Sequence, residues 1–435
     1  MSTQSTYQPT ALDAQLLFAC GVSYTIGANP SVPLNTEPYY TGTGFTAGTT
    51  PTIIQGIIPE TTGCLIGQIT VAGVNTILIA FRGTMLTEIN DWATDLMAEP
   101  IDTSTINPPP PYLFPGSVHS GFYMSLAEIL PEIETTLSAL LNTLGAGTPI
   151  AITGHSKGGG MASLAAYYLV HGANLSLTAS QITVTTFAGP NPGDTVFATA
   201  MASLNQKNFI NYLDIVPWLP LTQFYSGLIS SYFQGNPISN PTMQAILLLV
   251  LNTMSTWNYA SAATQTPYIN APNSSGDYII DATVSEFTAL LNIENAFATA
   301  SGNQSPNFEA ILAAHSHGCG GGYMFAICPT GTCPTGNCSL TTPTVNALLN
   351  QTVINGADTV AVNFTGNLPG TVFNWTNDNS SIGLAESGTG NIQAFTAVGG
   401  NATLMATITV TPIFTIGSTS QNGVPVSFTI TVNPS

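Results

Sequence analysis

Basic residues are scarce in this sequence, and their scarcity limits what the protein can bind. Lysine and arginine together number 3 among 435 residues, against 21 aspartate and glutamate residues, so the formal net charge at pH 7 is −18. Electrostatic binding to nucleic acid or to an anionic membrane surface requires clustered positive charge, so we expect no nucleic-acid partner. With 44% hydrophobic and only 6% charged residues, the chain is also unlike a disordered protein, which is rich in charge and poor in apolar residues.

Long apolar runs are also absent. The longest, AILLLVL at residues 245–251, is far shorter than the roughly 20 residues that a membrane-spanning helix needs. The opening residues, MSTQSTYQPT, have neither the basic region nor the apolar core of a signal peptide. We expect no transmembrane segment, and the protein is then either intracellular or a mature secreted form that begins at a new Met.

The cysteines help to choose between these two locations. Cys20 and Cys64 stand alone, whereas the other four crowd into one segment rich in Gly, Pro and Thr. These four are Cys319, Cys328, Cys333 and Cys338. A zinc site that also uses His315 or His317 is the alternative, but the cluster contains no C-x-x-C pair. We predict disulfide bonds, a secreted protein, and no metal or other cofactor.

Strand-like and helix-like segments alternate along the first 338 residues. The apolar runs expected to form strands are residues 64–71, 75–81, 149–153, 182–189 and 208–216. Residues 121–142 have the periodicity of an amphipathic helix. Such alternation predicts an α/β domain over residues 1–338, in which helices cover a mostly parallel central sheet.

Beyond residue 340 the pattern changes to short β-rich runs separated by Gly, Asn and Asp turns. These runs are residues 358–367, 371–379, 391–398, 402–412 and 424–432. Turn signals that recur every 8 to 12 residues or so are typical of a β-sandwich. The segment contains no histidine and no cysteine. We therefore predict a separate all-β sandwich at residues 342–435 that takes no part in catalysis.

Residues 154–158, GHSKG, have the G-x-S-x-G pattern of a nucleophile elbow. A β-compatible run, residues 150–153, precedes the pattern, and a helix-compatible segment follows from Gly160. The turn is so tight that small residues must flank the serine. The alternative is a glycine-rich turn that merely contains a serine, but the strand before it and the helix after it favour Ser156 as a catalytic nucleophile.

A serine nucleophile needs a histidine base, and this chain has 5 histidines. His155 adjoins the serine and cannot fold back onto its hydroxyl. His171 stands at the end of the following helix, where a capping role is ordinary. His119 precedes the serine, whereas α/β-hydrolases place the base after the nucleophile and the acid. His315 and His317 remain as candidates for the base.

The acid must lie between the serine and the base. Asp214 directly follows the run NFINYL (residues 208–213) and so falls at the carboxyl end of a predicted strand, where α/β sheets place their ligands. Asp194 is the fallback, in a context typical of a helix N-cap. The oxyanion hole needs two backbone N–H groups. We expect one from Lys157, the residue after the nucleophile, and one from Thr84, in the loop after an earlier strand.

A series of motifs resembles the class 3 (fungal-type) lipase family of α/β-hydrolases. In chain order these motifs are AFRGT, DWATDL, VHSGFY, GHSKGG, TFAGPNPGD and DIVPWLP, within roughly residues 15–330. The resemblance implies an α/β-hydrolase fold and hydrolysis of carboxylic esters, commonly acylglycerols. It assigns the catalytic triad to Ser156, Asp214 and a C-terminal His, the oxyanion hole to Thr84 and Lys157, and a lid to residues 85–95.

The sequence departs from the family pattern at three points. The family usually has Leu where this chain has Lys157, whose amine either binds an anionic substrate group or, as we favour, pairs with a nearby acid. In the family the catalytic histidine normally stands a few residues before an aromatic residue. Here GCGGG lengthens the gap to Tyr323, so the choice of base stays open, although His315 fits the family better than His317. Residues 221–300 are long enough to form an additional helical cap over the site.

These observations predict a secreted serine ester hydrolase that forms an acyl-enzyme. A triacylglycerol lipase or esterase that acts at a lipid–water interface is the leading hypothesis. The alternatives are a phospholipase or an aryl- or polymer-ester esterase with the same triad. An inert hydrolase fold in a binding or adhesion protein is a further alternative, because residues 342–435 resemble the Ig-like or PKD-like modules of secreted proteins. The sequence leaves the oligomeric state and the acyl-chain preference open.

Overall fold

The computed structural model describes two compact units. The described residues of the first unit are 7–26, 34–36, 39–47, 49–57, 62–84, 98–107, 110, 112–222, 226, 230, 245, 248, 252–270, 279–285, 288–289, 314–316 and 322–327. Those of the second unit are 343–366, 371–416 and 419–435. The predicted lid, the cluster of four cysteines and His317 lie outside the described residues. None of the helices in the described ranges is long and apolar enough to cross a membrane.

The first unit is built on a sheet whose middle is parallel and whose two edges are antiparallel. Its order is β1 (Thr52–Gln55), β2 (Gly63–Val71), β3 (Val74–Phe81), β6 (Ile150–His155), β7 (Ile182–Phe187), β9 (Lys207–Asn211), β11 (Tyr268–Ile269) and β12 (Ile280–Asp281). Every pair from β3 through β6, β7 and β9 to β11 is parallel. The predicted α/β class with a mostly parallel central sheet is thus confirmed.

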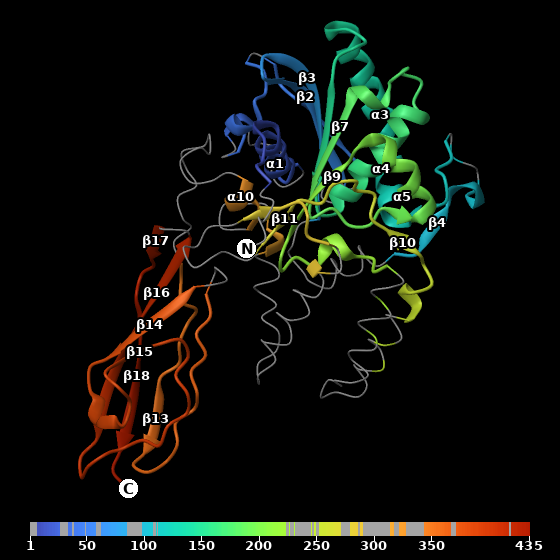
Figure 1. Cartoon of the computed structure of the whole chain (residues 1–435). Helices are drawn as coiled ribbons and strands as arrows, with labels where there is room; N and C mark the ends of the chain where they lie inside the picture. Colours follow the sequence, from blue (N-terminus) through green and yellow to red (C-terminus); the bar gives the residue numbers. More distant parts are fainter. Residues whose placement is uncertain are drawn as a thin grey trace, which may run out of the picture. The chain divides into compact units, whose positions relative to one another are not determined.

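Helices cover both faces of this sheet, which is why its central strands are continuous apolar runs. Every residue of β6 is buried. Helix α1 (Ala11–Ser23) lies on one side of the sheet, and α3 (Ser120–Leu144), α4 (Lys157–His171) and α5 (Thr195–Met201) lie on the other (Figure 1). Helix α3 buries residues three or four positions apart along one stripe, as its periodicity predicts.

Parts of the predicted cap, residues 221–300, extend sheets instead. Strands β11 and β12 add to the edge of the main sheet, and β10 (Tyr259–Ala260) joins a small sheet. That small sheet has the order β10, β8 (Gly193–Asp194), β5 (Ser117–His119) and β4 (Pro100–Asp102). Tyr268, Ile269 and Ile280 are at most 4% exposed, so their burial stabilises strands β11 and β12 although each has only two residues.

The second unit is all-β and has its own apolar core. Its strands are β13 (Gln351–Ile354), β14 (Val372–Asn377), β15 (Ser387–Thr389), β16 (Leu404–Ile416), β17 (Thr419–Asn422) and β18 (Val426–Asn433), in the sheet order β13-β18-β16-β14-β15, with β17 paired to β16. Single bridges join Asp358 to Thr396 and Val362 to Ile392. Side chains of β18 are alternately buried and partly exposed, as expected for a strand with one face on the core. The Ig-like or PKD-like assignment stays a prediction.

Candidate active site

Ser156 occupies a sharp turn between strand β6 and helix α4. Its backbone φ is 58° and ψ is −133°, a strained conformation for a residue with a side chain. A Cβ added at Gly154 would lie 2.1 Å from the carbonyl oxygen of Gly158, so only glycine fits there. The Ser156 N–H donates to the Phe187 carbonyl at 3.1 Å, and its Oγ makes no hydrogen bond to a described residue. This geometry is that of a nucleophile elbow.

The structure brings two other predicted site residues, Asp214 and His315, into direct contact. The Nδ1 atom of His315 lies 3.0 Å from both carboxylate oxygens of Asp214. The carboxylate also accepts the Val216 N–H at 2.9 Å and the Tyr323 hydroxyl at 2.8 Å. Asp214 is 0% exposed and His315 1% exposed, so these donors compensate a charge that has left water.

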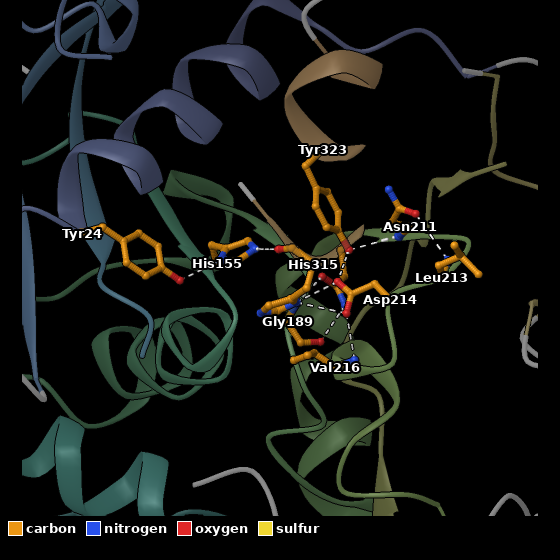
Figure 2. A network of polar contacts seen from close by, with 10 residues as sticks. Tyr24, His155, Gly189, Asn211, Leu213, Asp214, Val216, His315 and Tyr323 are labelled. Carbon is orange, nitrogen blue, oxygen red and sulfur yellow. Dashed lines mark hydrogen bonds and ion pairs between the residues drawn. The ribbon is translucent and has the colours of Figure 1, made fainter. Parts of the chain in front are cut away.

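Tyr323, in helix α10 (Gly322–Ile327), restrains the carboxylate of Asp214 (Figure 2). Its hydroxyl donates to Asp214 and accepts the Asn211 N–H at 3.0 Å, which connects α10 to the end of β9. Burial, together with the negative charge of Asp214, raises the pKa of Tyr323 well above its ordinary value. The phenol therefore stays neutral and remains a hydrogen-bond donor.

His155, next to the nucleophile, contacts the backbone of His315. Its Nε2 atom lies 2.6 Å from the His315 carbonyl oxygen, and its Nδ1 atom lies 2.7 Å from the Tyr24 hydroxyl (Figure 2). A carbonyl only accepts, so Nε2 carries a proton, and a neutral ring then accepts from the Tyr24 hydroxyl at Nδ1. Both ring nitrogens are engaged, which excludes His155 as the base. The contact also places His315 beside the residue that precedes Ser156.

The predicted oxyanion-hole residues lie on the helix that follows Ser156 and on a loop that packs against the elbow. Lys157 is the first residue of α4, and Thr84 lies in the loop after β3. That loop is packed tightly against the elbow, because a Cβ added at Gly83 would lie 2.6 Å from the His155 carbonyl oxygen. The Lys157 residue is only 8% exposed. The backbone around Ser156 therefore brings both predicted donor segments to the same turn.

The remaining candidates have structural roles. Asp194 caps α5, because its Oδ1 accepts the N–H groups of Val196 and Phe197, both at 2.9 Å. His119 caps α3, and His171 is the last residue of α4. Asp194 is thus a helix cap and not a second acid. Within the part of the chain that the structure describes, no three His, Cys, Asp or Glu side chains group as a metal site.

Comparison with known proteins agrees with this geometry. Residues 78–224 match the family model described as lipase (class 3). The matched segment holds Thr84, Ser156, Lys157 and Asp214, whereas His315 lies beyond it.

Two curated relatives align with about a third of the chain. A lipase from Rhizomucor miehei is 31% identical over 151 residues, which are 34% of this chain and 39% of the relative. The chloroplastic phospholipase A1-Igamma2 of Arabidopsis thaliana is 30% identical over 173 residues, which are 34% of this chain and 31% of the relative. The aligned region thus spans well under two thirds of either relative's own length.

Solved lipase structures are also similar to the chain. The native Rhizomucor miehei lipase propeptide complex is 22% identical, with a TM-score of 0.41 over 63% of this chain and 71% of that one. Lipase II from Rhizopus niveus is 16% identical, with a TM-score of 0.44 over 71% of this chain and 94% of that one.

Two supporting contacts around the candidate site were not predicted from the sequence. Tyr24 reaches His155 across 131 residues of chain, and no local pattern indicates such a contact. Asn208, in β9, brackets the peptide groups of Gly189: its Oδ1 accepts the Gly189 N–H at 3.0 Å, and its Nδ2 donates to the Gly189 carbonyl at 2.9 Å. Gly189 in turn abuts Gly159 of the elbow helix, since a Cβ on Gly159 would lie 2.6 Å from the Gly189 Cα.

Proposed function

We propose that this chain is a secreted serine ester hydrolase that cleaves acylglycerols through an acyl-enzyme. The observation that carries the proposal is the buried Asp214–His315 pair beside the strained elbow of Ser156. A buried carboxylate on one ring nitrogen of a histidine fixes its tautomer, which leaves the other nitrogen basic. The match to the class 3 lipase family supports an ester as the substrate.

The proposed reaction follows from these positions. His315 Nε2 takes the proton of Ser156 Oγ as the oxygen attacks the ester carbonyl, while Asp214 stabilises the imidazolium. The N–H groups of Lys157 and Thr84 stabilise the negative charge on the tetrahedral intermediate. His315 then gives its proton to the leaving alcohol. Water, activated by His315, hydrolyses the acyl-enzyme in the same way.

A phospholipid substrate is the second candidate. One curated relative is a phospholipase A1, and the cation of Lys157 directly follows the nucleophile, where it suits a phosphate-bearing substrate. A glyceride and a phospholipid of equal chain length, offered to the same preparation, distinguish the two candidates. An inert binding protein is the remaining hypothesis, and the intact Ser156, Asp214 and His315 set argues against it.

The experiment is replacement of the nucleophile. Ser156→Ala should reduce hydrolysis of tributyrin and p-nitrophenyl butyrate to a residual rate that is at most about 10³- to 10⁴-fold above the rate in water. That residual rate is the contribution of the oxyanion hole and of binding alone. Ser163→Ala is the matched control, because Ser163 is a buried serine of the helix that follows the elbow, and its hydroxyl donates to the Gly159 carbonyl. A fluorophosphonate probe should label the parent and the control but not Ser156→Ala. Near-normal turnover by Ser156→Ala would reject the proposal.

A further inference from the structure

The backbone of the proposed base is held separately from its side chain. The side chain of His315 contacts Asp214, whereas its carbonyl oxygen lies 2.6 Å from Nε2 of His155. His155 in turn contacts the Tyr24 hydroxyl at 2.7 Å. Figure 2 shows these contacts as one line from Tyr24 to Asp214. Because Ser156 directly follows His155, the line passes beside the nucleophile.

The two ends of this line determine the hydrogen-bond roles of His155. The His315 carbonyl can only accept, so the ring must present an N–H at Nε2. In the neutral ring Nδ1 then accepts, and the Tyr24 hydroxyl is its donor. Desolvation raises the pKa of Tyr24, so the hydroxyl keeps the proton that it donates. Tyr24 therefore stabilises the tautomer of His155 that holds the backbone of the base.

The Tyr24 hydroxyl also packs on the loop that carries Thr84, a predicted oxyanion-hole residue. A Cβ added at Gly83 would lie 2.1 Å from the Tyr24 hydroxyl oxygen and 2.6 Å from the His155 carbonyl oxygen. Glycine at this position lets the loop, the elbow strand and Tyr24 approach one another. Tyr24 thus touches the oxyanion-hole loop directly and reaches the base through His155.

Tyr24 is anchored at the end of helix α1, which packs on the strands that lead into the site. The Cys20 Sγ atom lies 3.4 Å from Oγ1 of Thr153 in β6, and the Ser23 hydroxyl donates to the carbonyl of Phe81 in β3 at 3.4 Å. Strand β6 ends at the elbow, and β3 ends at the oxyanion-hole loop. The helix that carries Tyr24 is therefore fixed to both catalytic segments.

We propose that Tyr24 and His155 are positioning residues that set the place of the base His315 relative to Ser156. The inference rests on the proposed hydrolase function and adds to it two residues that act through the base. A displacement of about 1 Å can cost about a hundredfold in rate, because a proton is transferred only between closely placed groups. Loss of these contacts should therefore impair the steps in which His315 gives or takes a proton.

The test compares two butanoate esters that differ in their leaving group. Dissolved tributyrin releases an alkoxide that needs a proton from His315, whereas p-nitrophenyl butyrate releases a stable anion that leaves without one. A displaced base therefore lowers kcat/KM for tributyrin more than for the nitrophenyl ester, while partial unfolding lowers both equally. Rates are expressed per site labelled by a fluorophosphonate, so that unfolded molecules do not count.

Tyr24→Phe removes the hydroxyl and keeps the ring. Its kcat/KM should fall at least about tenfold on tributyrin and less than about threefold on p-nitrophenyl butyrate. Tyr168→Phe is the matched control, because the Tyr168 hydroxyl donates to Glu134 at 2.6 Å, between helices α4 and α3. The ratio of the two rates should not change in this control.

His155 is tested by a pair of variants. His155→Gln keeps one donor and one acceptor on a planar amide, so it can bond to the His315 carbonyl and to the Tyr24 hydroxyl at the same time. It should keep the parent's ratio of the two rates. His155→Leu has neither group and should lower the tributyrin rate relative to the nitrophenyl rate at least about tenfold.

Tyr24→Phe and His155→Leu report independently, so each decides the matter if the other does not fold. An unchanged ratio in either folded variant, or a Gln variant as impaired as the Leu variant, would overturn the positioning role while leaving the hydrolase proposal intact. If the parent fails to hydrolyse tributyrin, the proposed function fails and this inference fails with it.

Discussion

At the residue scale, the arrangement of donors around Asp214 determines which group exchanges protons. The carboxylate accepts from His315, Tyr323 and Val216, and it is fully buried. Because the pKa of Tyr323 is raised by burial and by Asp214, that hydroxyl keeps its proton. The ring of His315 is then the group of this cluster that can exchange a proton with Ser156 during the reaction.

The choice of base is tested by comparing the two histidines. His315→Ala should reduce kcat on p-nitrophenyl butyrate as severely as Ser156→Ala, because the members of a triad act as a unit. His317→Ala should be milder, since His315 contacts Asp214 in the structure. Both variants should keep the melting temperature of the parent within a few degrees. The opposite ranking of kcat would assign the base to His317.

Lys157 is tested by restoring the apolar side chain that the family usually has at this position. Lys157→Leu keeps the backbone N–H that the oxyanion hole requires, so kcat on neutral esters should change less than about threefold. If the amine attracts anionic substrates, kcat/KM for a phospholipid should fall while that for tributyrin is maintained. A hundredfold loss on tributyrin would show that the side chain takes part in catalysis.

At the element scale, the elbow depends on backbone segments that approach too closely for side chains. Ser156 and Ala188 both have positive φ, at 58° and 52°. The Ala188 N–H donates to the Phe209 carbonyl at 3.0 Å, and Asn208 holds the next residue, Gly189. Strained turns persist only where the surrounding structure fixes them, and here β9 does so.

Glycine replacement measures this close packing. Gly159→Ala would place a Cβ 2.6 Å from the backbone of Gly189, so the elbow helix or the facing loop must shift. We expect a loss of about 1–3 kcal/mol in the free energy of unfolding, typical of overpacking, and at least a tenfold lower kcat. Gly147→Ala is the control, because nothing lies within 4 Å of an added Cβ there, and it should change stability by less than about 0.5 kcal/mol. Equal stability and turnover in the two variants would contradict the packing.

The main elements could be predicted because each has a local signal. Strands β2, β3, β6 and β7 are apolar runs, and the elbow follows one of them. Helix α1 was not predicted: it is buried on nearly all sides after Asp13, so it lacks the polar stripe that marks an amphipathic helix. Strands β11 and β12 have two residues each and exist only by pairing with β9 and with each other. Contacts of this kind depend on the tertiary fold, as does the bond between Tyr24 and His155.

At the scale of the whole molecule, the two units have separate apolar cores. One core centres on the main sheet and its helices, and the other includes Trp375, Ile408, Phe428 and Ile430 of the all-β unit. A unit with its own core can unfold as a cooperative element. The described residues of the candidate site, from Tyr24 to Tyr323, all belong to the first unit.

Truncation tests whether the first unit is a complete hydrolase. A chain of residues 1–341 keeps all six cysteines and every proposed catalytic residue, and it should hydrolyse p-nitrophenyl butyrate with a kcat/KM within about threefold of the parent. Calorimetry of the full chain should show two transitions, because two separate cores do not unfold in one two-state step. The truncated chain should retain one of these transitions. Residues 342–435, expressed alone, should supply the other transition. A truncated protein that stays folded but loses activity would show that the all-β unit completes the active site, and a single shared transition in the full chain would show that the two cores unfold together.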